Sequence, residues 1–531
     1  MFPASLPAST FPAYPQEQVL HPATASVAET DGTDRHKEQG VPSSVGRAGF
    51  ERLLEQDRYR IPFNIKTPQA LKTLLARFSD EFADPRQKRP CLILSGAGVV
   101  GMLVAVVLRE RYGYNVLIVE KRTSAWRQNV LELKRFLMKE FPPALIELLV
   151  KEKLITRSLG RAEVFGTRKG LRRAPPRSIL ADLAAPQPPI QRQSTLLLPP
   201  PAGAASIPWA YPDPAIESDS DFYAPYALTQ TRDMQAGLSR YCRQIGVHFL
   251  HGEITELDDR DDQGEFVPGI QLSDVPEDAK ETIRPPAALA AVVLITEGNT
   301  RRIDAFGGVD AIDVDEVWQQ RNYRAHHRGV GGTGGGSIEV DRDGKAAVIA
   351  QVWDGPDGLQ ANVSVLPSLS HAARMRAMSP AEAERELDAL FARAPLLLAK
   401  LPTPIIVDQS QETWRSPPVP IHITRARNPV HGNVIFLGDS PGLSSPFNSR
   451  GANDGAAGQL RILMEYIHDP RYLSASPGLR KEAENLARQR FNDVYRVRHG
   501  AELDLMLQFG FYTEQQVAEI KASFEKDRRM P

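Results

Sequence analysis

Residues Cys91–Glu120, CLILSGAGVVGMLVAVVLRERYGYNVLIVE, decide how this chain of 531 residues folds. The apolar run CLIL predicts a buried parallel strand, and a glycine-rich turn follows it directly. Residues Met102–Arg111 predict a helix, and Asn115–Val119 predict a second buried strand that ends at Glu120. A strand, a tight turn, a helix and a strand in this order predict an α/β fold with a doubly wound parallel sheet.

The turn carries the pattern G-x-G-x-x-G, and each of its glycines has a physical reason. Gly96 permits the tight turn, Gly98 lets the backbone approach a pyrophosphate, and Gly101 lets the helix lie close to the strand. The helix begins with N–H groups that attract phosphates, and Glu120 stands where a carboxylate accepts hydrogen bonds from ribose hydroxyls. The pattern predicts dinucleotide binding without separating FAD from NAD, and a nucleotide-free sheet with a glycine-rich turn is the structural alternative.

A second pattern lies more than three hundred residues further along the chain and favours a flavin. The apolar run Val434–Leu437 predicts another buried strand, which is followed by Gly438, Asp439 and, after a short interval, the stretch PFNSRGANDG. A carboxylate at this strand end is placed to bind the ribityl hydroxyls of FAD. The helix predicted through Tyr466 then directs its positive end at the flavin ring, where negative charge develops on reduction. A strand, a turn and a helix capped by an aspartate remain the alternative reading.

Together the two patterns resemble the FAD-dependent aromatic hydroxylases, the class of p-hydroxybenzoate hydroxylase and kynurenine monooxygenase. The resemblance carries the Gly-Asp motif of that class onto Gly438 and Asp439. It carries the flavin-proximal proline and the start of the following helix onto Pro446, Gly451 and Asn453. It implies a Rossmann-like FAD-binding sheet with an inserted, mainly antiparallel lobe that covers the substrate, followed by C-terminal helices.

This sequence departs from the hydroxylase pattern at two positions. Ser449 stands where the class usually has glycine, beside the flavin. Glu297 stands where the class has the aspartate of an Asp-Gly motif associated with cofactor and reductant binding. The negative charge is kept there but the side chain is one methylene longer, which bears on the use of NADPH.

A more local likeness follows Glu120. The stretch EKRTSAWRQNVLEL resembles the MICAL-type flavin monooxygenases, in which the acidic strand end is followed by E-K-R and then by R-x-N-V-L-x-L. This likeness implies that Arg122 and Arg127 lie near the FAD phosphates and that Asn129 lies near the isoalloxazine ring. The actin-related accessory domains of that family are absent from this sequence, so an actin substrate does not follow.

These patterns together give the residues expected to contact the cofactor. They are Gly96, Ala97, Gly98, Val100, Gly101, Glu120, Lys121, Arg122, Arg127, Asn129, Gly438, Asp439, Pro446, Gly451, Ala452 and Asn453. We assign no catalytic acid or base and no metal ligand, since the chemistry of such enzymes is carried by the cofactor.

Composition excludes several other classes of protein. Lys and Arg total 64 against 65 Asp and Glu, which removes the electrostatic argument for a nucleic-acid-binding protein. Two cysteines form no disulfide framework or cysteine-rich metal site and favour a reducing, cytoplasmic setting. No apolar run is long enough to span a membrane.

The same composition divides the chain into regions. Residues 1–47 are rich in Pro, Ser and Ala and predict a disordered leader, which is either a dispensable tail or a signal for delivery into a host cell by a bacterial secretion system. Twelve of the 43 prolines fall between residues 174 and 225, which predicts an inserted loop. The expected regions are the leader 1–47, a helical prelude 48–90, FAD-binding parts 91–173, 226–310 and 426–531, the insertion 174–225 and the antiparallel lobe 311–425.

The sequence therefore predicts an FAD-dependent monooxygenase that is reduced by NAD(P)H and hydroxylates a bound small molecule through a flavin hydroperoxide. A protein substrate has no support in the sequence. Two alternatives stay open: a flavin-dependent dehydrogenase or oxidase without oxygen insertion, and a secreted effector that keeps a degenerate flavin site.

Overall fold

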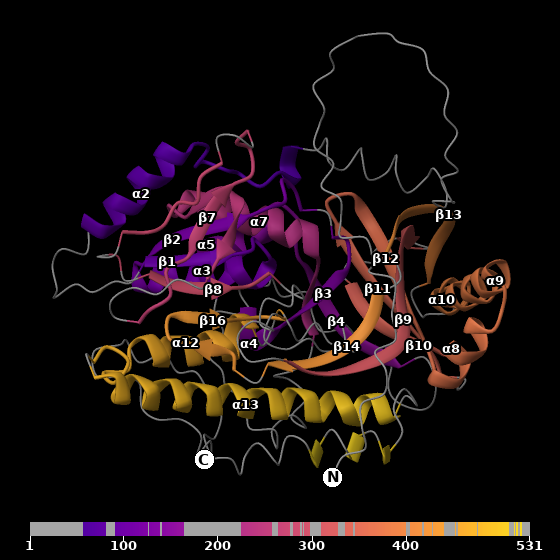
Figure 1. Ribbon diagram of the computed structural model, residues 1–531. Helices are drawn as coiled ribbons and strands as arrows, with labels where there is room; N and C mark the ends of the chain where they lie inside the picture. Colours follow the sequence, from indigo (N-terminus) through magenta and orange to yellow (C-terminus); the bar gives the residue numbers. More distant parts are fainter. Residues whose placement is uncertain are drawn as a thin grey trace, which may run out of the picture. The chain divides into compact units, whose positions relative to one another are not determined.

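The computed structural model places two sheets in the chain (Figure 1). Apart from short gaps, it describes residues 57–80, 91–163, 225–297, 309–327, 335–439 and 455–508, together with Ala452 and parts of 514–522. The expected leader and nearly all of the expected insertion lie outside these residues.

The first sheet has seven strands, and its central five are parallel. Its order is β15 (Val430–His431), β16 (Val434–Phe436), β8 (Ala291–Ile295), β1 (Cys91–Ser95), β2 (Asn115–Glu120), β6 (His248–Glu256) and β7 (Gly269–Leu272). The pairs β16–β8, β8–β1, β1–β2 and β2–β6 are parallel, whereas β15 and β7 are antiparallel edge strands. The predicted doubly wound parallel sheet is confirmed.

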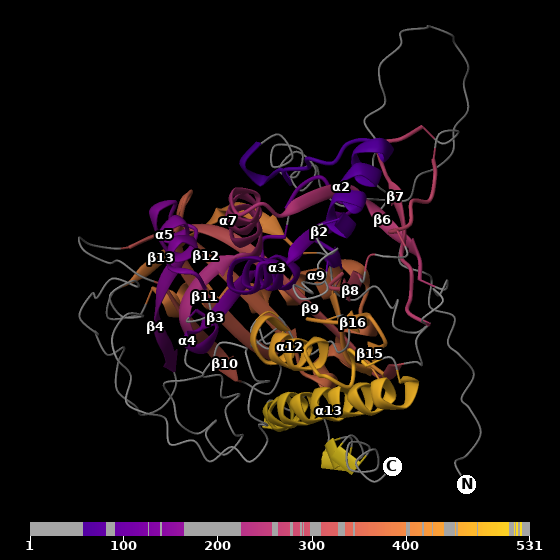
Figure 2. The same cartoon turned by 90° about the vertical axis from the view of Figure 1, so that its left-hand side faces the viewer.

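Helices cover both faces of this sheet, because alternate residues of each buried strand point to opposite sides. Leu92 and Leu94 of β1 pack under α3 (Val99–Tyr112), α7 (Thr231–Gln244) and α12 (Leu460–Ile467). Cys91 and Ile93 face α2 (Pro68–Asp80) on the other side (Figure 1, Figure 2). The helical prelude expected from leucines and phenylalanines three and four residues apart is therefore present as α2, which buries Leu71, Leu74, Leu75 and Phe78.

The second sheet has nine strands, eight of them along its main path. Their order is β13 (Ile405–Arg415), β9 (Val309–His327), β12 (Gly358–Pro367), β11 (Ala346–Gly355), β10 (Gly335–Arg342), β4 (Thr156–Glu163), β5 (Pro225–Gln230) and β3 (Val130–Lys134), with β14 (Val419–Ala426) paired to β9. Only the pair β4–β10 is parallel. The mainly antiparallel lobe expected from the sequence is thus present.

The division between the two sheets differs from a simple cut along the chain. Strands β3 and β4 fall within residues 91–173, and most of β5 falls within 226–310, yet all three pair in the nine-stranded sheet. The reason is that strand pairing is set by distant partners, which local periodicity does not reveal.

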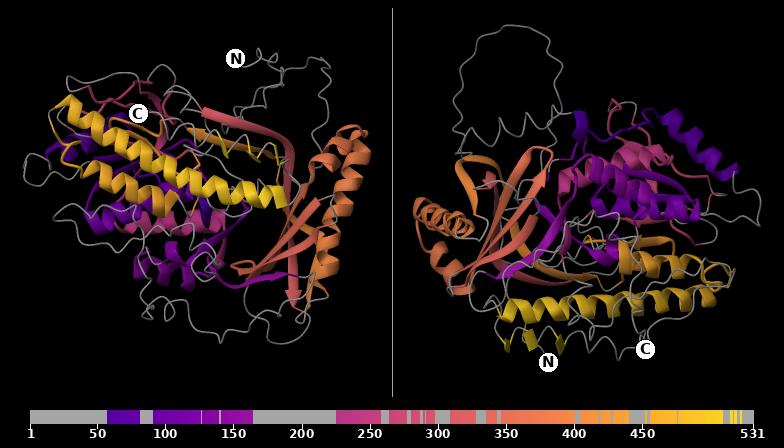
Figure 3. Two further views of the ribbon diagram at one scale, coloured as in Figure 1. Left: turned by 90° about the horizontal axis from the view of Figure 1, so that it is seen from below. Right: turned by 180° about the vertical axis from the view of Figure 1, so that it is seen from behind.

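The faces of the nine-stranded sheet differ in chemistry. One face is apolar and packs against α8 (Leu369–Arg376), α9 (Pro380–Phe391) and α10 (Arg393–Leu398), with Val348, Val363 and Val365 at its centre. Views from below and from behind show these helices on the side of the sheet that faces away from the seven-stranded sheet (Figure 3). The opposite face is polar and is described with the candidate site.

The remaining described helices pack around the two sheets. They are η1 (Asp57–Tyr59), α4 (Arg135–Met138), α5 (Pro143–Lys151), the single π-turn η6 (Gly455–Gln459) and α13 (Pro477–Gln508). Of these, α4 packs against β3 and β5 of the nine-stranded sheet, and α13 packs against α12 and β15. Within the described part of the chain, no helix is both long and apolar enough to cross a membrane.

Candidate cofactor site

The glycine-rich turn lies at the carboxyl end of β1, against the end of β8. Gly96 has a φ of +102°, and its N–H donates to the Val119 carbonyl at 2.8 Å. A Cβ at Gly96 would lie 3.1 Å from the Thr296 oxygen and from the Cα of Glu297. Glycine is required here both by the positive φ and by the close approach of β8.

The other two glycines of the turn differ in what surrounds them. A Cβ on Gly101 would lie 2.4 Å from Thr296 Oγ1 and 2.6 Å from the Gly96 oxygen, so the packing of α3 requires a glycine. A Cβ on Gly98 would meet the Thr296 oxygen at 3.6 Å, an ordinary contact, and the φ of Gly98 is −70°. No neighbour within the described residues therefore requires glycine at position 98. A bound group that approached this backbone closely would require it.

The N–H groups in the first turn of α3 lie directly after the glycine-rich turn. Gly98 is the N-cap of this helix and offers no side-chain oxygen to the first N–H groups. Uncapped N–H groups and the positive end of the helix dipole together favour a phosphate. This end of α3 suits a pyrophosphate, as the pattern predicts.

Glu120 closes the turn from the end of β2. One carboxylate oxygen accepts a hydrogen bond from the Ala97 N–H at 2.7 Å, and the other accepts from the backbone N–H and Nε of Arg122 at 2.9 and 3.0 Å. The side chain is only 2% exposed. Burial pushes the pKa of Glu120 upward, but the charge and hydrogen bonds of Arg122 and the Ala97 N–H outweigh it, and the pKa lies below its ordinary value. Glu120 is therefore an anion held against the fingerprint turn.

The loop after Glu120 carries the other predicted residues of this half of the site. Arg122 folds back onto Glu120, whereas the side chains of Lys121 and Arg127 are exposed. The carbonyl of Arg127 accepts the Arg232 N–H at 2.8 Å, and the carbonyl of Asn129 accepts the Thr231 N–H at 2.9 Å. The segment 127–129 is thus fixed to the start of α7.

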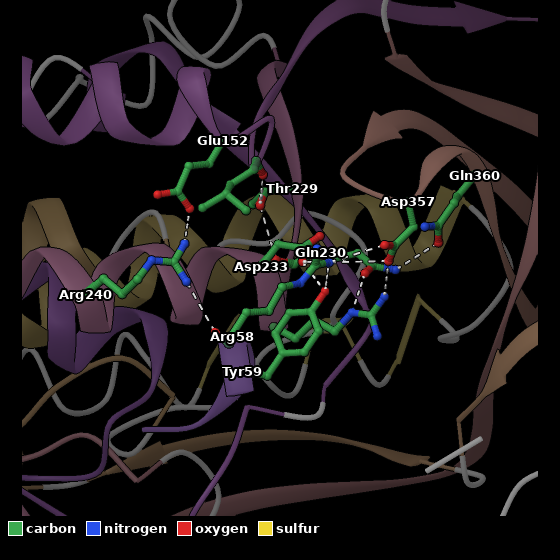
Figure 4. A network of polar contacts seen from close by, with 11 residues as sticks. Arg58, Tyr59, Glu152, Thr229, Gln230, Asp233, Arg240, Asp357 and Gln360 are labelled. Carbon is green, nitrogen blue, oxygen red and sulfur yellow. Dashed lines mark hydrogen bonds and ion pairs between the residues drawn. The ribbon is translucent and has the colours of Figure 1, made fainter. Parts of the chain in front are cut away.

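The first turn of α7 links this segment to the fingerprint. Gln235 donates from Nε2 to the Ala97 carbonyl at 3.0 Å. Charged residues at the start of a helix are often solvated, but this turn is buried. Arg232 and Asp233 are 4% and 2% exposed, because a distant segment and the β11–β12 turn cover them (Figure 4).

The second pattern meets the first at Val100. Gly438 lies in the turn after β16 and has a φ of +73°, and a Cβ added to it would lie 3.2 Å from the Val100 side chain. A Cβ on Gly455 would lie 2.8 Å from the Gly438 Cα and 3.0 Å from Val100. The two sequence patterns, although far apart in the chain, thus lie close together at Val100.

Gln459 holds the second turn in place, although neither sequence pattern includes it. Its Oε1 accepts the Gly438 N–H at 2.6 Å and its Nε2 donates to the Gly438 carbonyl at 3.3 Å. The side chain is fully buried. The only sequence signal is a polar residue within an otherwise apolar stretch after the glycines.

The remaining predicted residues of the second pattern divide between described and undescribed parts. Asp439 is partly exposed in the turn after Gly438, and Ala452 packs on the core beneath α3 and α12. Pro446, Gly451 and Asn453 lie outside the described residues. Glu297, the residue that replaces the aspartate of the hydroxylase motif, accepts a hydrogen bond from the Ser95 hydroxyl beside the fingerprint turn.

The polar face of the nine-stranded sheet adjoins the segment 127–129. Asn322 of β9 donates to the Gln128 carbonyl at 3.0 Å and accepts from Asn362 of β12. Gln320 of β9 donates to Asn362 at 3.2 Å and to Ser364 at 3.0 Å. All of these side chains are buried, and a cluster of buried amides such as Gln320, Asn322 and Asn362 is uncommon in a protein core.

Three buried polar atoms near this face have no hydrogen-bond partner among the residues that the structure describes. They are Gln320 Oε1, Trp353 Nε1 and Gln128 Nε2. The face also holds a buried pair of opposite charges, since Lys134 donates to Glu132 at 3.3 Å. An acceptor and two donors are therefore available to a bound molecule, and the charges present are already paired. The described residues include no group of three or more His, Cys, Asp or Glu side chains able to hold a metal ion.

Comparisons with known proteins agree with this arrangement at the level of the fold. No protein-family model matches the chain, and no curated protein matches its sequence. Among solved structures, CmlS, a flavin-dependent halogenase, superposes with a TM-score of 0.52 over 82% of this chain and 70% of its own, at 14% identity. The chain has the fold of this flavin-dependent enzyme.

Two further solved structures are similar over comparable lengths. The p-nitrophenol 4-monooxygenase PnpA from Pseudomonas putida DLL-E4 has a TM-score of 0.48 at 18% identity, covering 83% of this chain and 94% of its own. The myxobacterial chondrochloren halogenase CndH has a TM-score of 0.49 at 14% identity, covering 79% and 82%. The expected resemblance to flavin-dependent enzymes is thus supported at the level of the fold by the halogenase CmlS, whereas the MICAL-type likeness of residues 120–133 stays a prediction.

Proposed function

We propose that this protein binds FAD and, with NAD(P)H as the reductant, hydroxylates a small-molecule substrate. The observation that supports this most is the close approach of Gly438 and Gly455 to Val100, because it brings the dinucleotide turn and the flavin-type turn into one site. A dinucleotide that carries a flavin has a use for both turns, whereas NAD alone has a use only for the first.

The residues present fit FAD at its adenosine end. The Gly98 backbone and the uncapped end of α3 would hold the pyrophosphate, and Glu120 would accept from the ribose once the guanidinium of Arg122 gives way. Asp439 would accept from the ribityl chain, with Gln459 fixing the turn that presents it. When bound, FAD supplies the transfer of electrons from a nicotinamide to oxygen, and the protein supplies orientation and electrostatics.

The substrate would lie against the polar face of the nine-stranded sheet. Gln320, Asn322 and Asn362 are held by one another, so their rotamers are fixed before any ligand arrives. Hydrogen bonds from such a face orient a polar substrate and leave the redox chemistry to the cofactor. Both cysteines are buried free thiols, which supports our proposal that the protein works in a reducing compartment such as the cytoplasm.

The purified protein gives a direct test. Its absorption spectrum and titrations with FAD and FMN report whether it binds a flavin and which one. Anaerobic mixing with NADPH or NADH, followed by oxygen, then separates the open alternatives. In a monooxygenase the flavin absorption bleaches with the nicotinamide and a hydroxylated product forms once oxygen is added. In an oxidase the flavin absorption bleaches but no hydroxylated product forms. In a degenerate site the flavin absorption does not change. Failure of FAD to bind overturns the proposal.

A further inference from the structure

A segment that precedes α2 lies against the loop after Glu120. We call residues 57–65 the N-terminal strap. The Ile61 N–H donates to the Thr123 carbonyl at 2.9 Å, and the Ala125 N–H donates to the Tyr59 carbonyl at 2.9 Å. These bonds flank an antiparallel bridge between Arg60 and Ser124. The strap thus pairs with residues 123–125 through an isolated β-bridge.

The strap continues along the neighbouring strand, β6. The N–H groups of Asn64 and Ile65 both donate to the Phe249 carbonyl at 3.1 Å, and Phe249 returns a bond to the Asn64 side chain at 2.8 Å. The ring of Phe63 lies 4.9 Å from that of His251, whose Nε2 contacts the Lys121 carbonyl at 3.0 Å. The loop 121–125 is therefore held by the strap at one end and through His251 at the other.

The strap also fixes the first turn of α7. The Tyr59 hydroxyl donates to Asp233 at 2.9 Å in a site where both side chains are buried (Figure 4). The guanidinium groups of Arg58 and Arg232 lie over the Tyr59 ring at 4.5 and 4.9 Å, and Arg240 donates to the Arg58 carbonyl at 3.3 Å. Burial raises the pKa of Tyr59, so its hydroxyl keeps its proton and remains the donor.

These contacts continue into the cofactor site from both sides. Residues 121–125 wrap the Glu120 carboxylate, which accepts from the Arg122 backbone and side chain. The first turn of α7 holds the Ala97 carbonyl through Gln235. Glu120 and Ala97 are joined directly by a 2.7 Å hydrogen bond. One connected set of contacts thus runs from the strap to both parts of the predicted adenosine end.

We infer that the N-terminal strap is part of the dinucleotide site: by holding the loop 121–125 and the first turn of α7, it positions Glu120 and Ala97 for the adenosine diphosphate half of the cofactor. Tyr59 is accordingly a positioning residue. The inference rests on the proposed binding of FAD. Its physical basis is preorganisation, because a loop that is already ordered loses less conformational freedom when the ligand binds.

A pair of conservative substitutions in the full chain tests the inference. Tyr59→Phe removes the hydroxyl that reaches Asp233 near the start of α7. Tyr241→Phe is the matched control, since Tyr241 is likewise buried and donates to a carboxylate, Glu110, at 2.6 Å from the far part of the same helix. Both variants lose one tyrosine–carboxylate hydrogen bond. Tyr59→Phe is expected to lose more stability, because Asp233 is buried whereas Glu110 is exposed, so the comparison rests on ligand affinity and not on the melting temperature.

The measurements are the dissociation constants of FAD and of ADP, the melting temperature, and hydrogen exchange at residues 121–125. We expect Tyr59→Phe to weaken the binding of FAD and of ADP by the same factor, about threefold to tenfold. We also expect it to speed hydrogen exchange at residues 121–125. Tyr241→Phe should change neither affinity. Equal affinities in the two variants, or a loss confined to FAD with ADP unchanged, would overturn the inference.

The outcome for the unmodified protein separates this inference from the proposed function. If the unmodified protein binds ADP but not FAD, the proposed function fails and the role of the strap is still measured with ADP. If it binds FAD and Tyr59→Phe leaves FAD and ADP affinity unchanged, the proposed function stands and the inference fails. If it binds neither, both fail.

Discussion

Val100 and Gly438 lie close together, since a single Cβ added to Gly438 would come within 3.2 Å of the Val100 side chain. Val100 belongs to the first turn of α3, and Gly438 follows β16. These elements meet because β1, β8 and β16 are neighbours in one parallel sheet, whose carboxyl ends lie on the same edge. Ligands of open α/β sheets bind at this edge.

The first prediction contrasts two glycines of the fingerprint. Gly98→Ala should leave the free energy of unfolding within about 1 kcal/mol of the unmodified value, because its Cβ makes only an ordinary contact. It should nevertheless weaken FAD binding about tenfold or more. Gly101→Ala should lower stability by about 1–3 kcal/mol, because its Cβ collides with Thr296 and with the Gly96 carbonyl. Denaturant unfolding and FAD titration measure both quantities. Unchanged FAD affinity in Gly98→Ala would contradict the pyrophosphate assignment.

The second prediction compares the two acidic residues of the site. Asp439→Ala should bind FAD more weakly than Glu120→Gln, because the ribityl hydroxyls lose their acceptor at a cost of about 1–3 kcal/mol, whereas glutamine keeps one carbonyl acceptor. Glu120→Gln should show the larger fall in melting temperature, since it removes the partner of Arg122. If Asp439 only capped a helix, its replacement would cost about 1 kcal/mol of stability and leave FAD affinity unchanged.

The third prediction concerns acid stability. The pKa of Glu120 is lower in the folded chain than its ordinary value, so its ionised form stabilises the fold at neutral pH. This contribution is complete above the unfolded-state pKa of about 4.3 and is lost as the pH falls through the lower pKa of the folded state. Urea unfolding of the unmodified protein and Glu120→Gln between pH 7 and acid should therefore converge as the pH falls. A constant difference between them would refute the role of the ionised carboxylate.

The fourth prediction concerns residues 1–47, whose composition predicts a disordered leader. Removing them should leave the melting temperature and the flavin content unchanged, because no apolar core is lost. Thermal unfolding and absorption spectra of the shortened and full-length chains measure this. A fall of several degrees would show that the leader packs on the rest of the protein.

Local sequence was sufficient for the elements that carry their own signals. The glycine turn, α3 and β2 follow from short apolar runs and from glycines required by a positive φ or by close packing, as at Gly96 and Gly101. Helix α2 followed from apolar residues three and four apart. In each case the signal, an apolar run or a short glycine pattern, lies within a few residues of sequence, so the sequence by itself determined the fold class and the glycine-rich turns.

Only the tertiary structure decided which distant groups complete the site. Nothing near Thr231–Gln235 in the sequence shows that Tyr59 and Asp357 bury this turn, and nothing near Gly438 shows that Gln459 binds its peptide group. Strands β3 and β5 likewise join the nine-stranded sheet through partners far along the chain. Burial and strand pairing depend on surfaces that meet only after the chain has folded, which is why local periodicity predicts the turns that begin the site but not the residues that hold it together.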